Sequence, residues 1–381
     1  MARDVSTAGS SDQLLDTYWR NVVRRRAFLK GVGMAGAALP AAALFATNVQ
    51  AADSMLSKGD VAILRFLAAA EIIESDLWQQ YNELGGADGG NAAYIAALQN
   101  LDGDMPQYIT DNTDDELSHA AFLNAYLRWK GAQPVNLDEF RILPSSKAAG
   151  ARQIGRLTNL QGLDVDLSWY TRYRSSENPD LGDSFAGPLT ITNQPAIPLD
   201  DTDTPPSMSQ PVPPTTSQQN RLQAIANTAG FHFGYIEQGG SSLYTTLALQ
   251  ASSLQVLRIV VSIGGVEADH FSLWHDKAAN AVSQPLAGVT DPETGLTFPD
   301  FNSPPGRELF QTNKILPEPC DFISEDLPDC SVIRPSSTRN SGAVATIKSF
   351  VADQLFRGQS REFFEAIMAL AAAADAARRE L

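Results

Sequence analysis

The chain has 381 residues, with 28 Lys and Arg against 44 Asp and Glu, so its formal net charge is −16. A surface this acidic repels nucleic acid and anionic lipid, and we expect no nucleic-acid partner. The length allows one elaborated domain or two, with a substantial core.

The N-terminal 51 residues have the features of an export signal. Residues 25–30 (RRAFLK) resemble the twin-arginine export motif, and a weakly apolar run over 31–46 and small residues before position 52 follow it. Because that run is broken by Pro40 and is shorter than the ~20 apolar residues of a membrane span, we predict cleavage, with a permanent anchor as the alternative. The predicted partner is the twin-arginine machinery, and the mature protein would be periplasmic or extracellular, without a membrane partner.

The remaining chain is more acidic still. Residues 1–51 carry six basic and three acidic residues, which leaves 22 basic against 41 acidic residues and a net charge of −19. The twin-arginine resemblance implies export of a protein that is already folded and often already loaded with its cofactor. Such a route suits a metalloprotein.

Four long segments have apolar residues at helical spacing. They cover residues 60–84, 104–130, 218–250 and 254–281. Asp104 is the expected N-cap of the second segment, with Pro106 in its first turn. Glycine pairs follow the first segment, and Ser252 and Ser253 separate the third from the fourth. The sequence therefore predicts two helical hairpins.

Two Glu-x-x-His pairs lie inside these helices. Glu116 precedes His119 by three residues in the second helix, and Glu267 precedes His270 by three in the fourth. The chain has only four histidines and fifteen glutamates, so two such pairs are improbable by chance. Residues i and i+3 share one face of a helix, so each pair can present a carboxylate and an imidazole to one metal ion.

Each hairpin also brings a single glutamate level with a Glu-x-x-His pair. Glu237 and Glu267 lie about fifteen residues either side of Ser252, and an antiparallel hairpin places such residues side by side. In the first hairpin, Glu71 lies at nearly the same distance from the turn as the pair in the second helix. Glu74, one turn later, is the alternative to Glu71.

The rest of the chain divides into an insertion and a C-terminal region. Residues 52–281 would form the bundle, and within it residues 132–217 are long enough for a crossover that makes the two hairpins parallel. Residues 282–381 would form a proline-rich loop region followed by helices over 343–356 and 363–379 that pack on the bundle. For Cys320 and Cys330, an exported protein favours a disulfide, with two thiols as the alternative.

This pattern resembles the ferritin-like superfamily, whose dimetal centres take one Glu from each of two helices and a Glu-x-x-His from each of the other two. The segments at residues 70–74 (AEIIE) and 115–119 (DELSH) are most similar to exported ferritin-like proteins that include desiccation-related proteins. The resemblance implies an all-α fold, a ferritin-like four-helix bundle with a long crossover insertion and extra C-terminal helices. The metal ligands it implies are Glu71, Glu116, His119, Glu237, Glu267 and His270.

Four carboxylates and two imidazoles suit two iron or manganese ions. The function expected from the resemblance is a reaction with dioxygen or peroxide, of the oxidase, ferroxidase or catalase type. The alternative is a non-enzymatic stress or desiccation-related protein with a structural or vestigial metal site. A homo-oligomer is compatible with either.

Other residues that could carry chemistry have simpler interpretations. His232 and His275 are out of line with the predicted ligands, and we expect packing or surface roles for them. Tyr244 shares the helix face of Glu237 and is expected to be a core tyrosine. Trp169, Tyr170 and Tyr173 are expected to hold the crossover in place.

Overall fold

The computed structural model describes residues 56–171, 189–208, 213–302, 317, 319–320, 323–331 and 338–380. The predicted export signal and Tyr173 lie outside these residues. Within the described ranges, none of the helices has the length and apolar character needed to cross a membrane.

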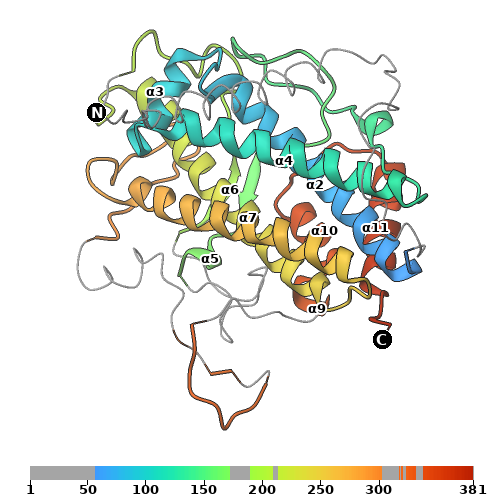
Figure 1. The fold of residues 1–381 in the computed structure, drawn as a ribbon. Helices are drawn as coiled ribbons and strands as arrows, with labels where there is room; N and C mark the ends of the chain where they lie inside the picture. The colour runs from blue at the N-terminus through green and yellow to red at the C-terminus, as the bar shows by residue number, and fades with distance from the viewer. Residues whose placement is uncertain are drawn as a thin grey trace, which may run out of the picture. The chain divides into compact units, whose positions relative to one another are not determined.

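Four long helices dominate the fold, and the prediction of an all-α bundle is confirmed. They are α2 (Lys58–Gly85), α4 (Met105–Trp129), α6 (Ser217–Ala248) and α7 (Leu254–Ala279). Helix α2 packs along α4 and α6 packs along α7, which gives the two predicted hairpins (Figure 1). The two hairpins meet through contacts such as the hydrogen bond from Tyr126 Oη on α4 to Gln255 Oε1 on α7, 3.1 Å long.

Side-chain caps fix where three of these helices begin. The side chains of Ser57 and Ser253 accept hydrogen bonds from backbone N–H groups in the first turns of α2 and α7. Thr216 and Gln219 form a reciprocal capping box at the start of α6. Asp104 is at the N-cap position of α4, as predicted, but its side chain makes no capping hydrogen bond.

Several short elements were not predicted. They are α3 (Ala92–Leu101), η1 (Asp138–Phe140), β1 (Leu163–Val165), α5 (Ser168–Thr171), β2 (Ile191–Gln194) and η2 (Asn280–Val282). Strands β1 and β2 pair antiparallel within the crossover. Strands this short have no alternation to detect, whereas α3 buries Tyr94, Leu98 and Leu101 at helical spacing and could have been found.

The described part of the crossover contributes to the core rather than lying on the surface. Leu157, Leu160 and Leu163 have no exposed surface. The rings of Trp169 and Tyr170 pack against Phe231 of α6 with centroid separations of 6.2 and 5.5 Å. The expectation that these two aromatic residues hold the crossover in place is confirmed.

One buried carboxylate ties the crossover to α2. Asp76 Oδ2 accepts hydrogen bonds from the backbone N–H groups of Leu157 (2.9 Å) and Thr158 (3.0 Å) and from the Thr158 hydroxyl (2.7 Å). Its other oxygen, Oδ1, lies 2.6 Å from Arg141 Nη1. Gln80 Nε2 also donates to Oδ2 (3.3 Å). Asp76 has no exposed surface, so its charge depends on these partners.

The C-terminal region covers the bundle with α9 (Thr338–Ser341), α10 (Ala343–Ala352) and α11 (Arg361–Asp375). Helix α11 packs along α2, and α10 packs against both α11 and α6, as expected.

The prediction of a disulfide between Cys320 and Cys330 is wrong for this structure, in which the two cysteines are not bonded to each other. Cys320 is buried and Cys330 is exposed, so the two thiols lie in different environments.

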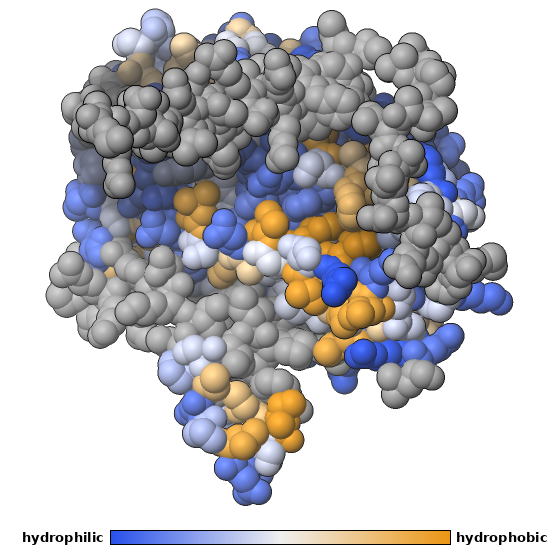
Figure 2. Space-filling view, in the orientation of Figure 1, coloured by the Kyte–Doolittle hydropathy of each residue, from blue (hydrophilic) through white to orange (hydrophobic). Residues whose placement is uncertain are grey.

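Figure 2 shows apolar residues grouped among hydrophilic ones on the face of the molecule seen in Figure 1. Four large apolar side chains of the long helices are more than half exposed: Phe122 and Trp129 on α4, and Leu254 and Val261 on α7. Single exposed apolar side chains are common on soluble proteins.

Replacing Asp76 with Ala should lower the free energy of unfolding by about 3 kcal/mol, because the change leaves a part-buried guanidinium and two buried backbone N–H groups without their acceptor. Asp138→Ala is a matched control, since Asp138 also pairs with Arg141 (3.1 Å) but its side chain is 72% exposed. For that exposed pair we expect a loss below about 1 kcal/mol. Urea denaturation of both variants measures the difference, and equal losses would contradict the anchoring role of Asp76.

Candidate metal centre

All six predicted ligands come together in the middle of the bundle, from all four long helices. Their ligand atoms form two groups, within each of which the atoms lie no more than 4.8 Å apart. The first group is Glu71, Glu116, His119 and Glu267, and the second is Glu116, Glu237, Glu267 and His270. Glu116 and Glu267 belong to both groups, so these two carboxylates lie between the two half-sites.

Each imidazole turns the same nitrogen toward the carboxylates. His119 Nδ1 lies 3.4 Å from Glu71 Oε2, 3.3 Å from Glu116 Oε2 and 3.5 Å from Glu267 Oε1. His270 Nδ1 lies 3.3 Å from both Glu116 Oε1 and Glu237 Oε2. The i, i+3 spacing on α4 and α7 therefore aims carboxylate and imidazole at one volume, as the sequence predicted.

Burial and repulsion between neighbouring charges make two of the carboxylates, Glu116 and Glu267, hard to ionise. Burial, with the charges of Glu71 and Glu237, raises the pKa of Glu116 to about 7. Burial and the neighbouring carboxylates also raise the pKa of Glu267 well above its ordinary range. Burial acts to lower the pKa of His119, but the close carboxylates of Glu116 and Glu71 and their negative charges outweigh it and raise the pKa to about 10. The cluster is therefore a strong attractor of positive charge.

Three carboxylate oxygens in this cluster are buried and accept no hydrogen bond from any described residue: Glu71 Oε2 and both oxygens of Glu267. Buried carboxylate oxygens without partners are costly, and structures normally avoid them. Two divalent cations would balance four carboxylate charges and use these lone pairs. The residues present thus fit a pair of metal ions.

Neighbouring polar side chains hold several of these groups in place. Asn112 Nδ2 donates to Glu116 Oε1 (2.9 Å) and to Glu237 Oε1 (3.0 Å), while Asn112 Oδ1 accepts from Trp274 Nε1 (2.7 Å). The Trp274 indole therefore fixes which way the amide faces, because it can only donate. The sequence analysis missed Asn112, although it lies four residues before Glu116 and so on the same helix face.

Tyr244 is buried, as expected of a core tyrosine, but its hydroxyl also donates a hydrogen bond to Glu71 Oε1.

Gly240 on α6 leaves space for a carboxylate of the cluster. A Cβ atom at this position would lie 2.5 Å from Glu267 Oε2, so a larger residue would force this carboxylate to shift. Glycine in a helix signals close approach in general, yet the sequence did not show what approaches Gly240.

The geometry separates Glu71 from its alternative. Glu74 is also buried, but it supplies no oxygen to either group, whereas Glu71 does. His232 and His275 lie outside both groups, as expected. Both are buried rather than on the surface: a hydrogen bond joins His232 Nδ1 and the Tyr81 hydroxyl (2.7 Å), and His275 stacks on Tyr170.

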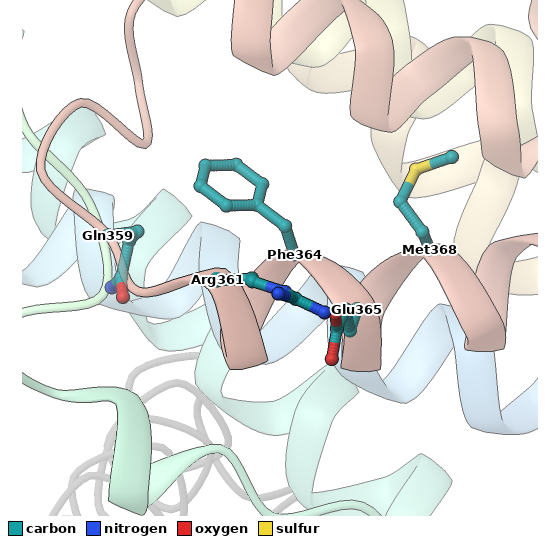
Figure 3. Close-up of a pocket in the computed structure, with 5 residues that line it drawn as sticks. All are labelled: Gln359, Arg361, Phe364, Glu365 and Met368. Atoms are coloured by element: carbon teal, nitrogen blue, oxygen red, sulfur yellow. The ribbon is translucent and has the colours of Figure 1, made fainter.

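A surface pocket of about 530 Å³ lies elsewhere, along α11. Its lining residues are Gln359, Arg361, Phe364, Glu365 and Met368 (Figure 3). Arg361 Nε and Glu365 Oε1 pair with each other at 2.6 Å, which satisfies both charges. The pocket shares no residue with the carboxylate cluster.

Comparison with protein families decides the identity of the bundle. The family model described as a ferritin-like domain matches residues 59–279. The chain belongs to the ferritin-like domain family. The match begins in the first turn of α2 and ends with α7. It therefore covers the crossover and the four helices that supply the carboxylate cluster. Searches of curated proteins and of solved structures gave no match.

The buried His232 should make stability depend on pH. Burial lowers its pKa to about 3, so the folded protein keeps it neutral while the unfolded chain takes up a proton below about pH 6.5. Stability is therefore lost as the pH falls from about 6.5 towards 3, by at most about 1.4 kcal/mol per pH unit from this group.

His232→Asn, which can still accept from Tyr81, should reduce that loss. Urea unfolding at about pH 7 and about pH 5 measures it, and we expect the variant to lose ~1–2 kcal/mol less than the original protein across this interval. Equal losses in the two proteins would show that His232 is not the group responsible.

Proposed function

We propose that the cluster holds two iron or manganese ions, with Glu116 and Glu267 as bridging ligands. Glu71 and His119 would complete one half-site, and Glu237 and His270 the other. The observation that carries this proposal is the membership of Glu116 and Glu267 in both groups of ligand atoms. Hard carboxylate oxygens with one imidazole per ion suit iron and manganese.

When bound, such ions supply the means to bind and reduce dioxygen or peroxide, and we propose a reaction with one of these oxidants. The low exposure of the ligand side chains favours a small reactant. The four carboxylates are at most 1% exposed, whereas His119 and His270 are 8% and 6% exposed. The imidazole side is therefore where the cluster comes closest to solvent.

The surrounding residues keep the cluster ordered and dry. The rings of Trp78, Phe233 and Trp274 pack together with centroid separations between 4.7 and 5.4 Å. Trp274 belongs to this aromatic layer and also holds Asn112 against Glu116 and Glu237. Carboxylates that are held in this way undergo little rearrangement when charge develops next to them.

A structural role is the second candidate. One group of ligand atoms joins α2, α4 and α7, and the other joins α4, α6 and α7. Two ions would therefore cross-link all four helices. A stress or desiccation-related protein could use such ions only to stabilise its fold.

We further propose that the protein is exported. Two features of the sequence support this proposal. Residues 1–51 contain the RRAFLK run that resembles the twin-arginine motif, and the remaining chain is strongly acidic. The likeness to desiccation-related proteins with such a signal belongs to the same proposal.

Replacing both His119 and His270 with Ala should abolish tight binding of iron and manganese while leaving the helix content nearly unchanged, because the helices of the bundle are packed mainly by apolar residues outside the cluster. Metal analysis and circular dichroism measure the two effects. His232→Asn, which changes a buried histidine outside the cluster, should retain both ions. A double variant that still holds two ions would show that the proposed ligands are wrong.

The metal-loaded protein should consume dioxygen or peroxide, and the double-histidine variant should not. An oxygen electrode, with ferrous iron or an organic reductant present, and a peroxide assay measure this consumption. A fully loaded protein that consumes neither, and whose melting temperature rises on metal binding, would favour the structural role instead.

A further inference from the structure

The two halves of the cluster have unequal surroundings. Half-site 1 is defined here as the group containing Glu71 and His119, and half-site 2 as the group containing Glu237 and His270; both share Glu116 and Glu267. Each half-site offers three carboxylates and one imidazole, so the ligand atoms alone would give two equal positions. The difference lies in the residues that contact the ligands.

The imidazole of half-site 2 is held from both sides. His270 Nε2 lies 3.1 Å from Asp115 Oδ2, and a carboxylate can only accept, so Nε2 carries the proton. The other nitrogen, Nδ1, faces Glu116 and Glu237 inside the cluster. A carboxylate behind an imidazole fixes the ring and its tautomer and makes the inner nitrogen a stronger metal ligand.

The imidazole of half-site 1 has no such support. The described residues form no hydrogen bond or ion pair with His119 Nε2, although its Nδ1 faces the carboxylates just as in His270. The sequence gives the reason. The residue before Glu116 is Asp115, which reaches across to the histidine of α7, whereas the residue before Glu267 is Val266. In the approximate twofold relation between the two helices, Val266 has the position of Asp115 and cannot accept a hydrogen bond.

The carboxylates that belong to only one half-site, Glu237 and Glu71, also differ in how they are held. Asn112, itself held by Trp274, donates to Glu237 of half-site 2 and to the shared Glu116, so Glu237 is fixed relative to a carboxylate that both half-sites use. In half-site 1, Glu71 Oε1 accepts from the Tyr244 hydroxyl, and its Oε2 accepts no hydrogen bond from the described residues.

We propose that the two positions are unequal: half-site 2 binds its ion more tightly and fills first, and half-site 1 holds the ion that exchanges. Asp115 is the positioning residue responsible for most of the difference, through His270. This inference rests on the proposed function, since it requires two metal ions. An exchangeable ion next to a retained one suits a reaction in which ferrous iron is itself the substrate.

The test is a titration of the metal-free full-length chain with Mn²⁺, in which the electron paramagnetic resonance signal of free Mn²⁺ reports how much remains unbound. We expect two ions to bind with clearly separated affinities. Asp115→Ala should weaken the tighter step about 10- to 100-fold and bring the two steps together. Asp115→Asn, which keeps an acceptor oxygen, should restore part of the loss.

Asp269→Ala is the matched control, because Asp269 is an exposed acid adjacent to His270 and is not among the described carboxylates that pair with the His270 ring. This variant removes the same charge and should leave both steps unchanged. The converse variant, Val266→Asp, should strengthen the weaker step selectively by giving His119 the acceptor it lacks. Circular dichroism confirms that each variant folds.

Two equal affinities in the unmodified protein would overturn the inference while leaving the proposed function intact. So would an Asp115→Ala variant that binds like the unmodified protein, or equal losses in the Asp115→Ala and Asp269→Ala variants. If the protein binds neither Mn²⁺ nor Fe²⁺, the proposed function fails and the inference fails with it.

Discussion

The structure depends on four glutamates buried within a few ångströms of one another in a helical core. Burial and repulsion between neighbouring charges raise the pKa of Glu116 and Glu267, and the two histidines that face the four carboxylates supply at most two positive charges. Oxygens of Glu71 and Glu267 are left without hydrogen bonds from the described residues. A helical core tolerates such a cluster when bound cations neutralise the carboxylates. Without cations, the buried charges would destabilise the folded protein. Metal binding and folding of this protein are therefore expected to be coupled.

Much of the surrounding fold serves to hold that cluster. Each hairpin supplies one lone glutamate and one Glu-x-x-His pair, so neither hairpin alone can form the site. The crossover between the hairpins is anchored on α2 by Asp76 and packs its aromatic residues against α6. At finer scale, Gly240 leaves space for a carboxylate of α7, and Trp274 orients Asn112 toward two others. These contacts belong to different elements but converge on the same few oxygens.

The sequence predicted what depends on regular spacing. Helix periodicity located the four helices to within two residues, and the i, i+3 pairs with their level glutamates predicted which side chains would meet. Contacts that depend on three-dimensional packing were not predictable: nothing local marks Asn112, Asp115 or the space at Gly240 as part of a site. The β1–β2 ribbon was too short to show a pattern. The disulfide was wrong because redox compartment predicts whether cysteines tend to pair, while geometry decides whether two particular thiols do.

The central claim is that this ferritin-like bundle carries a two-metal centre. The most direct test is metal analysis of the protein purified from its native source, with no metal added. We expect close to two iron or manganese ions per chain, because two divalent ions balance the four buried carboxylates. Metal-free protein that also refuses both metals on reconstitution would contradict it, and the Glu-x-x-His pairs would then be a relic of the family's site.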